Sequence, residues 1–284
     1  MIFRWISYLP LTILYGVSGL LYIMVYHLAR YRYQIVKNNL INCFPDKSKT
    51  EIERIIAQFY RNFCDYVVET LKSISISGEE LRHRVIIKNS HLMEGYLRNG
   101  TSVLALTSHQ FNWEWLLLAL SQHLTAPLNP VYKKLNNKYF DNLLLGIRSR
   151  FGCQPVEMQK TLSRIFSQRE VATAYGFLAD QTPLADADIY WSTFLGQETA
   201  FFTGTERIAH LTNYPVLFIG MKKIKQGHYE INFEKIAEPP YFKNDHTILE
   251  RYIERIEQQI RERPAGWLWS HRRWKHKKPV FYSI

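Results

Sequence analysis

The sequence predicts an α/β fold in which a mixed β-sheet is flanked by helices. From about residue 85 onward, short apolar runs alternate with segments of helical periodicity, which is the pattern of such folds. Towards the C-terminus, two apolar runs at 215–221 and 229–233 flank a short Gln-Gly-His turn and predict a hairpin. The sheet should therefore contain antiparallel as well as parallel strands.

The chain opens with an apolar stretch from Trp5 to Leu28 that contains no Asp, Glu, Lys or Arg. As a single helix it would be about 36 Å long, enough to cross a hydrocarbon core of roughly 30 Å. Pro10 lies inside it, but proline is tolerated in membrane helices. A cleaved signal peptide is disfavoured because the apolar region is too long. We therefore expect an N-terminal transmembrane or membrane-associated helix.

Basic residues set the expected orientation of this helix. Arg30, Arg32 and Lys37 follow the apolar stretch, so the positive-inside rule places the rest of the chain in the cytoplasm. The prediction is a single-pass membrane protein with the bulk of its chain on the cytoplasmic face. The alternative is a buried or interfacial amphipathic helix whose polar groups are tyrosines, namely Tyr8, Tyr15, Tyr22 and Tyr26.

A helical lead-in follows, and then the alternating region. Residues 38–44 predict a helix that ends at Pro45, and 49–72 a longer one with its apolar residues on one face. Ser77-Gly78 predicts a hinge. The remaining predicted strands are 85–87, 102–107, 129–132 and 174–179, and the remaining helices are 90–98, 113–120, 139–150, 203–213 and 247–263. The predicted domains are an anchor (1–30), a helical lead-in (31–80) and the main domain (81–284).

Charge and cysteines narrow the class of partner. The formal net charge is +11, which favours an anionic partner: a nucleic acid, a membrane surface or an acidic carrier. No RNP, KH or helix-turn-helix signature is present, so a nucleic acid is not expected. Cys43, Cys64 and Cys153 are isolated in the sequence, which predicts reduced thiols and no structural zinc.

The segment with the most chemistry is Thr107 to Glu114. His109 follows a buried strand, where α/β sheets place their ligands. Glu114 is five residues further on, about 140° away on a single helix. A strand–turn–helix junction with Asn112 as N-cap would bring the two side chains together. Glu114 could then hold one imidazole nitrogen while the other faces a substrate hydroxyl.

This segment resembles the His-x-x-x-x-Asp/Glu motif of the lysophospholipid acyltransferase superfamily, and more narrowly the late acyltransferases of bacterial lipid A biosynthesis. Further blocks resemble that family in its order: Asn39-Leu40 to Phe44-Pro45, Val131 to Asn137, Phe140 to Gly152, Ala179-Asp180-Gln181, Phe194-Leu195-Gly196 and Trp267 to Trp274. The blocks span nearly the whole chain. Lys133-Lys134 departs from the family's usual Arg-Pro.

The resemblance implies acyl transfer from an acyl-carrier-protein thioester to a hydroxyl of a lipid A precursor or a related anionic lipid. It implies His109 and Glu114 as the catalytic dyad, and no metal or organic cofactor. Two alternatives remain: a different acceptor (a lysophospholipid, glycolipid or aminolipid), or a catalytically silent lipid-binding protein of the same fold. The acyl chain length, the hydroxyl position and the oligomeric state stay open.

Other candidate substrate-binding residues are Arg148, Arg150, Asp180, Gln181 and Lys133. Two residues apart on a helix, the arginines point in different directions, so we expect one to bind phosphate and the other to be structural. Asp180 and Gln181 follow a strand and either line the acceptor site or cap a loop. In the C-terminal block, five basic residues at 272–278 are interleaved with tryptophans at 267, 269 and 274. This pattern favours a bilayer interface or an anionic head group.

Overall fold

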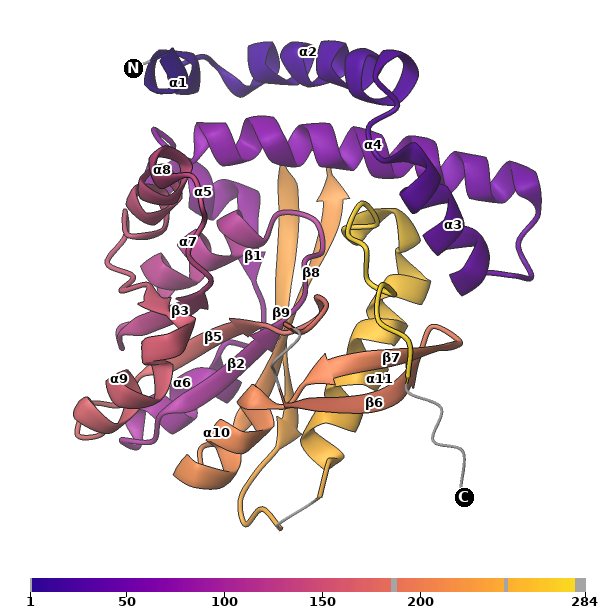
Figure 1. Ribbon diagram of the computed structural model, residues 1–284. Helices are drawn as coiled ribbons and strands as arrows, with labels where there is room; N and C mark the ends of the chain where they lie inside the picture. The colour runs from indigo at the N-terminus through magenta and orange to yellow at the C-terminus, as the bar shows by residue number, and fades with distance from the viewer. Residues whose placement is uncertain (1, 185–187, 243–244, 279–284) are drawn as a thin grey trace, which may run out of the picture.

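The computed structural model describes residues 2–184, 188–242 and 245–278, which form a mixed seven-stranded sheet flanked by helices (Figure 1). The predicted fold class is therefore confirmed. The sheet has the order β1-β9-β8-β2-β5-β3-β4. Its strands are β1 (Val85–Ile87), β2 (Val103–Thr107), β3 (Leu128–Tyr132), β4 (Val156–Glu157), β5 (Ala174–Leu178), β8 (Val216–Lys225) and β9 (His228–Ala237).

The centre of the sheet is parallel and its mixed character comes from the late hairpin. β2 pairs in parallel with both β5 and β8, while β8 and β9 pair in an antiparallel register. All five residues of β2 are buried. A strand covered on both faces needs apolar residues at every position, which explains the continuous apolar run in the sequence.

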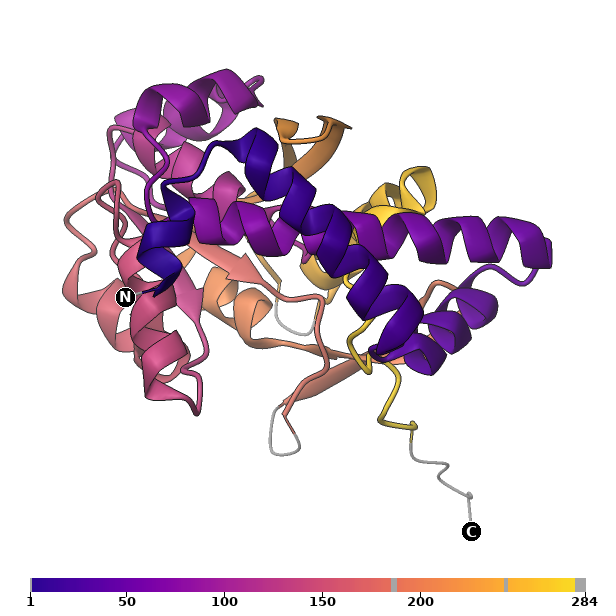
Figure 2. The same cartoon turned by 90° about the horizontal axis from the view of Figure 1, so that it is seen from above.

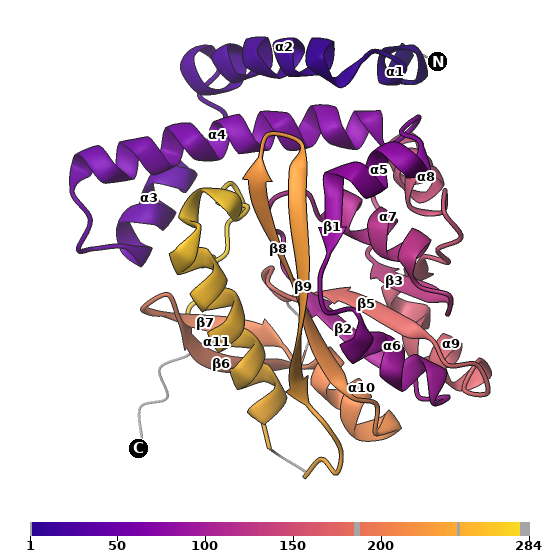
Figure 3. The same ribbon diagram turned by 180° about the vertical axis from the view of Figure 1, so that it is seen from behind.

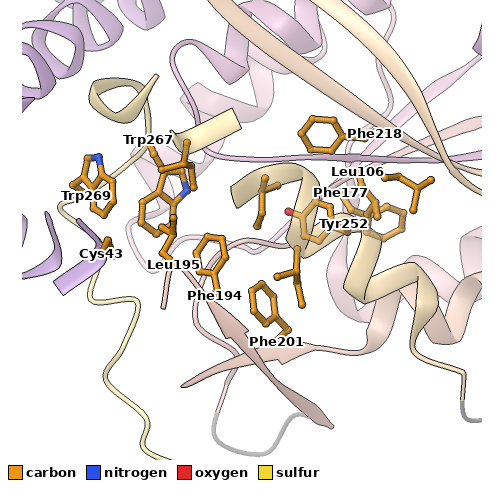
Figure 4. Packing of buried hydrophobic residues seen from close by; sticks show 14 of the residues in the cluster. Cys43, Leu106, Phe177, Phe194, Leu195, Phe201, Phe218, Tyr252, Trp267 and Trp269 are labelled. Carbon is orange, nitrogen blue, oxygen red and sulfur yellow. The ribbon is translucent and has the colours of Figure 1, made fainter. Parts of the chain in front are cut away.

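Helices cover both faces of the sheet (Figure 3). One apolar core holds residues of α5, α6, α7 and α8, and the other residues of α3, α10 and α11. Phe218 and Tyr252 belong to the second core (Figure 4). The bounds are α3 (Tyr33–Cys43), α4 (Lys49–Lys72), α5 (Gly78–Arg84), α6 (His91–Arg98), α7 (Trp113–His123), α8 (Lys138–Arg148), α9 (Thr161–Ser167), α10 (Gly204–Thr212) and α11 (Thr247–Glu262), with short 3₁₀ turns η2 (Met158–Lys160) and η3 (Pro264–Gly266). The three cysteines are free and buried.

Several elements differ from the sequence prediction. The expected hinge at Ser77-Gly78 is the start of α5, where the Ser77 hydroxyl accepts a hydrogen bond from the Glu80 amide as an N-cap. A second sheet of two strands, β6 (Ile189–Phe194) and β7 (Gln197–Phe202), was not predicted. Its turn places Leu195 and Gly196 at φ of 50° and 76°, a conformation that few non-glycine residues adopt.

The sequence predicted one helix for the N-terminal apolar stretch, but the structure breaks the stretch after Ser7. It forms α1 (Ile2–Ser7), α2 (Leu11–Tyr22) and a π-helical turn, η1 (Ile23–Leu28). The break falls where Pro10 serves as the N-cap of α2, because proline lacks the amide proton that a continuous helix requires. By length and composition, Leu11–Leu28 is the one candidate membrane span in the described residues, with a mean hydropathy of 1.6.

Helix α2 crosses α4 obliquely on the outside of the molecule (Figure 2). Polar contacts join the two helices: the Tyr15 hydroxyl donates to Glu69 at 2.9 Å, and the Ser18 hydroxyl donates to Asp65 at 2.8 Å. Glu69 is fully buried and also accepts hydrogen bonds from Asn112 and Tyr229, both at 2.7 Å. Asn112 is the N-cap of α7, so Glu69 connects the N-terminal helix to the start of the helix that carries Glu114.

Glu69 should make the stability of the protein depend on pH. Burial raises its pKa to about 7, although hydrogen bonds from Tyr229 and Asn112 act in the opposite direction. Its pKa in the unfolded chain is about 4.3, so the folded protein binds the extra proton between these values and loses stability as pH rises through this window. Glu69→Gln keeps the shape but removes the charge. In urea unfolding at pH 5 and pH 8, the stability of Glu69→Gln relative to wild type should therefore increase with pH. A relative stability that is equal at both pH values would contradict the ionisation of Glu69 in this range.

Candidate active site

His109 and Asp180 meet at the carboxyl edge of the sheet because they follow neighbouring parallel strands. The register pairs Thr107 at the end of β2 with Leu178 at the end of β5. His109 and Asp180 each lie two residues beyond these paired positions. Adjacent parallel strands end at the same edge, so the two side chains are brought together by topology alone.

The Asp180 carboxylate is saturated with hydrogen bonds. One oxygen lies 2.6 Å from His109 Nδ1, and the other accepts from the His109 amide at 2.9 Å and from Trp267 Nε1 at 2.7 Å. Burial raises the pKa of Asp180, but the charge of His109 and these three hydrogen bonds outweigh it, and the pKa lies below its usual range. An ionised Asp180 accepts from Nδ1–H, which leaves Nε2 as the basic nitrogen. No hydrogen bond of the described residues occupies Nε2.

Glu114 does not make the hydrogen bond to His109 that the sequence analysis assigned to it. Both of its oxygens bind Arg148 instead, at 3.0 Å from Nε and 2.6 Å from the terminal nitrogen. Glu114 is 1% exposed, so its charge requires a partner, and the planar guanidinium supplies a bidentate one. The sequence pattern did not reveal this partner because Arg148 lies on another helix, α8, whose packing on α7 is a property of the fold.

The two arginines of the Arg-Ser-Arg block have different environments, as their spacing predicts. Arg148 lines the cavity beside Glu114. Arg150 donates to the carbonyl oxygens of Ser73 and Ile76, at 2.5 and 2.8 Å, and so ties the end of α8 to the segment between α4 and α5. Arg150 is therefore positioned for a structural role.

The C-terminal block packs against the His109 loop. The sequence pattern favoured a bilayer interface for its tryptophans, but two of the three are buried in the protein. Trp267 and Trp269 are 2% and 0% exposed. The Leu268 amide donates to the His109 carbonyl at 3.1 Å, and the Phe111 amide donates to the Gly266 carbonyl at 2.8 Å. Buried indole rings fill the core here, with Trp267 next to Phe194 (Figure 4). The block thus supports the His109 loop from the side away from the cavity.

Two basic groups of this block stand near Asp180. Arg273 is 1% exposed and stacks over the Phe201 ring at 4.5 Å. Burial lowers its pKa to about 10, so it remains a cation at neutral pH and its charge favours the ionised form of Asp180. Burial and the charge of Arg273 lower the pKa of His271 to about 4. His271 is therefore neutral at pH 7 and accepts a hydrogen bond from the Thr182 amide at 3.1 Å.

A cavity of about 860 Å³ opens in front of His109. Most of its lining residues are apolar, and the polar ones include Glu114, Arg148, Gln181 and His271. Lys133, Lys134, Arg207 and Lys275 add positive charge to the lining. Asp180 lies behind His109 and is not part of this lining, so its contact is with His109 and Trp267. Of the sequence candidates, Arg148, Gln181 and Lys133 therefore reach the cavity, whereas Asp180 and Arg150 do not line it. The arrangement suits a substrate with a long apolar chain and a negatively charged group.

Gly266 packs so closely against the Phe111 ring that we expect no side chain to be tolerated at residue 266. A Cβ on Gly266 would lie about 2.5 Å from the Phe111 ring. Gly266→Ala should therefore lower the free energy of unfolding by about 1–3 kcal/mol through overpacking. The matched control is Gly95→Ala in α6, where a Cβ has open space and alanine should stabilise the helix by about 0.5–1 kcal/mol. Thermal melting of both variants tests this, and equal melting temperatures would contradict it.

Comparison with known proteins gives this geometry its context. A family model described as bacterial lipid A biosynthesis acyltransferase matches residues 1–276. The chain is also similar to a lipid A biosynthesis palmitoleoyltransferase of Escherichia coli K12, at 23% identity over 251 residues, covering 88% of this chain and 80% of the relative. A lipid A biosynthesis acyltransferase of Shigella flexneri matches with the same identity and coverage. The match to the family model extends from the N-terminal helix through the C-terminal tryptophan block, and the chain belongs to the bacterial lipid A biosynthesis acyltransferase family.

Proposed function

We propose that this acyltransferase moves a fatty acyl group from an acyl-carrier-protein thioester to a hydroxyl of a lipid A precursor, with His109 as the general base. The observation that carries the proposal is the His109–Asp180 hydrogen bond of 2.6 Å beside an apolar cavity. Such a pair fixes the imidazole tautomer and leaves one basic nitrogen for the substrate. The net charge of +11 favours an acidic carrier protein and a phosphorylated acceptor.

The reaction needs one proton to move twice. His109 Nε2 removes the proton of the acceptor hydroxyl as the oxygen attacks the thioester carbonyl. A tetrahedral oxyanion forms, and its collapse forms the ester, breaks the carbon–sulfur bond and releases the carrier thiolate. The imidazolium then returns its proton to that sulfur. The Asp180 carboxylate stabilises the imidazolium while it exists.

Glu114 contributes to this site through Arg148. Its bidentate contact holds the guanidinium at the cavity wall. A guanidinium placed there donates its remaining N–H groups to the oxyanion or to a substrate phosphate. Arg148 is thus the substrate-binding arginine of the pair, and Lys133 and Gln181 bind the polar part of the acceptor at the cavity lining.

The membrane supplies the acceptor in this proposal. Residues 11–28 anchor the protein to the inner membrane, and the catalytic domain lies on the cytoplasmic face, where acyl carrier protein is found. The hydropathy of this segment and the basic residues after it support attachment to a membrane with anionic lipids.

The first test is transfer by purified protein with labelled acyl-carrier-protein thioester and a lipid A precursor. His109→Ala should lower kcat by roughly a hundred- to ten-thousand-fold, because a hydroxyl is a poor nucleophile without a positioned base. Asp180→Asn should also lower kcat strongly with less effect on KM, because the charge that stabilises the imidazolium is lost. Thermal melting checks that each variant is folded. Mass spectrometry of the product identifies the acceptor and separates lipid A from a lysophospholipid, glycolipid or aminolipid. Near-normal turnover in folded His109→Ala would overturn the mechanism.

The second test asks which partner Glu114 acts through. Glu114→Gln should lower kcat, and the loss should be much smaller when Arg148→Lys is already present, because the interaction is then already broken. In an Asp180→Asn background the loss should multiply, because Asp180 acts on His109 and not on Arg148. The measurement is kcat/KM for the three single and two double variants. The reverse pattern, in which the losses multiply with Arg148→Lys and do not multiply with Asp180→Asn, would show that Glu114 acts through His109.

A further inference from the structure

The N-terminal segment α1–α2–η1 packs apolar and hydroxyl-bearing side chains against the protein and leaves a second set of apolar side chains exposed on its outer side. The residues of α2 that are buried or half-buried follow a helical stripe and include Leu14, Tyr15 and Ser18. The opposite stripe is exposed and aliphatic: Ile13 is 51%, Leu20 64% and Met24 55% exposed. A water-facing stripe would carry charged residues, but residues 5–28 contain no Asp, Glu, Lys or Arg, and this indicates an apolar environment outside.

The segment crosses over the C-terminal half of α4 and contacts it, or the turn that follows it, at several points. From one end to the other, the successive contacts are Ser75 to the Ser7 carbonyl, Lys72 to the Leu9 carbonyl, Tyr15 to Glu69, Ser18 to Asp65, Arg61 to the Tyr22 ring and Tyr60 to the Tyr26 ring. Figures 1 and 2 show α2 lying flat over α4 rather than projecting from it.

These contacts are incompatible with a helix that crosses the bilayer. If α2 left α4 to cross the membrane, the buried carboxylates of Glu69 and Asp65 would lose donors, and the Tyr15 and Ser18 hydroxyls would enter hydrocarbon unpaired. If it crossed while docked, the contacted part of α4 would enter as well, with charged residues such as Arg61, Asp65 and Lys72. Lying in the membrane plane avoids both costs.

The exposed apolar surface continues onto α8. Phe3 of α1 lies 6.3 and 6.2 Å from the rings of Tyr139 and Phe140, which are 53% and 45% exposed. The loop before α8 carries Leu135, which is 42% exposed and lines the cavity in front of His109. The outward surface of α1, α2 and η1 thus leads to the cavity mouth.

Charge favours one occupant for this surface. The first 45 residues contain four basic side chains, Arg4, Arg30, Arg32 and Lys37, and no Asp or Glu. Arg4 and Arg30 are exposed at the two ends of the apolar segment, and Lys133, Lys134 and Lys138 are exposed beside Tyr139. An aliphatic surface edged by cations suits the interface of an anionic phospholipid bilayer.

We infer that α1, α2 and η1 lie in the plane of one leaflet as an interfacial membrane-binding surface, not as a transmembrane span, and that the lipid acceptor enters the cavity laterally along Tyr139 and Phe140. The lateral route rests on the proposed function. The in-plane placement does not, because it follows from the contacts of α2 with α4 and from the exposed side chains alone.

Topology is tested with single cysteines at the two ends of the segment, Arg4→Cys and Arg30→Cys, in the full chain. A membrane-impermeant maleimide is applied to spheroplasts and to inverted membrane vesicles. Glu170→Cys, on an exposed loop, reports the side of the catalytic domain, and the unsubstituted protein, whose cysteines are buried, gives the background. All three cysteines should be labelled in the same preparation. Labelling of Arg4→Cys only in the opposite preparation from Glu170→Cys would show a span and overturn the inference, as would recovery of the protein free of membranes.

Vesicle binding tests the surface itself without any acyl transfer. Leu20→Asp should weaken binding to phosphatidylglycerol vesicles by roughly tenfold or more, because it replaces an apolar side chain that would insert into the bilayer with a charge. Phe166→Asp, at an aromatic residue of α9 that is 50% exposed, is the matched control and should bind like wild type. An equal loss of vesicle binding in both variants would overturn the inference that α1, α2 and η1 form the membrane-binding surface. Retained binding together with an inactive wild-type enzyme would count against the proposed function alone.

The lateral route is tested with Tyr139→Ser/Phe140→Ser. This double variant should raise the apparent KM for acceptor presented in vesicles by severalfold. Its KM for acceptor dispersed in detergent should stay close to that of wild type, because the aromatic residues then no longer lie between bilayer and cavity. An equal change in both assays would overturn the lateral route.

Discussion

The carboxylate of Asp180 is the point at which three distant parts of the chain meet. It binds the ring and the backbone amide of His109 after β2, it is carried on the end of β5, and it accepts the indole proton of Trp267 from the C-terminal block. A fully buried carboxylate is costly unless its lone pairs are satisfied, so all three segments are required for it to remain ionised. The orientation of His109, the rear wall of the site and the packing of the tryptophan block therefore depend on one another.

Much of the fold could be predicted because its signals are local. The bounds of α4 agree with the predicted 49–72, since an N-cap serine and a long amphipathic stripe mark them. The β6–β7 hairpin was missed because its turn uses Leu195 with positive φ, and no asparagine-glycine or aspartate-glycine pair announces it. The N-terminal apolar run was read as one helix because hydropathy does not register that Pro10 starts a new helix against α4.

The site was predicted less completely, for a physical reason. The sequence placed His109 and Asp180 each just after a strand, but it did not show that β2 and β5 are neighbours, so their pairing was not assigned. The partner of Glu114 was misassigned for the same reason. A motif of fixed spacing draws attention to residues that are close along the chain, whereas Asp180 and Arg148 lie 71 and 34 residues from their partners. Strand order and helix packing, which are properties of the whole chain, decide these contacts.

The place of Trp267 in the chain has a consequence for biosynthesis. Residue 267 leaves the ribosome 87 residues after Asp180, and the Gly266 and Leu268 contacts that hold the His109 loop arrive with it. A nascent chain that ends before this block therefore lacks the residues that support the His109 loop from behind. If the N-terminal segment binds the membrane as proposed, the residues for attachment are synthesised before those that complete the site.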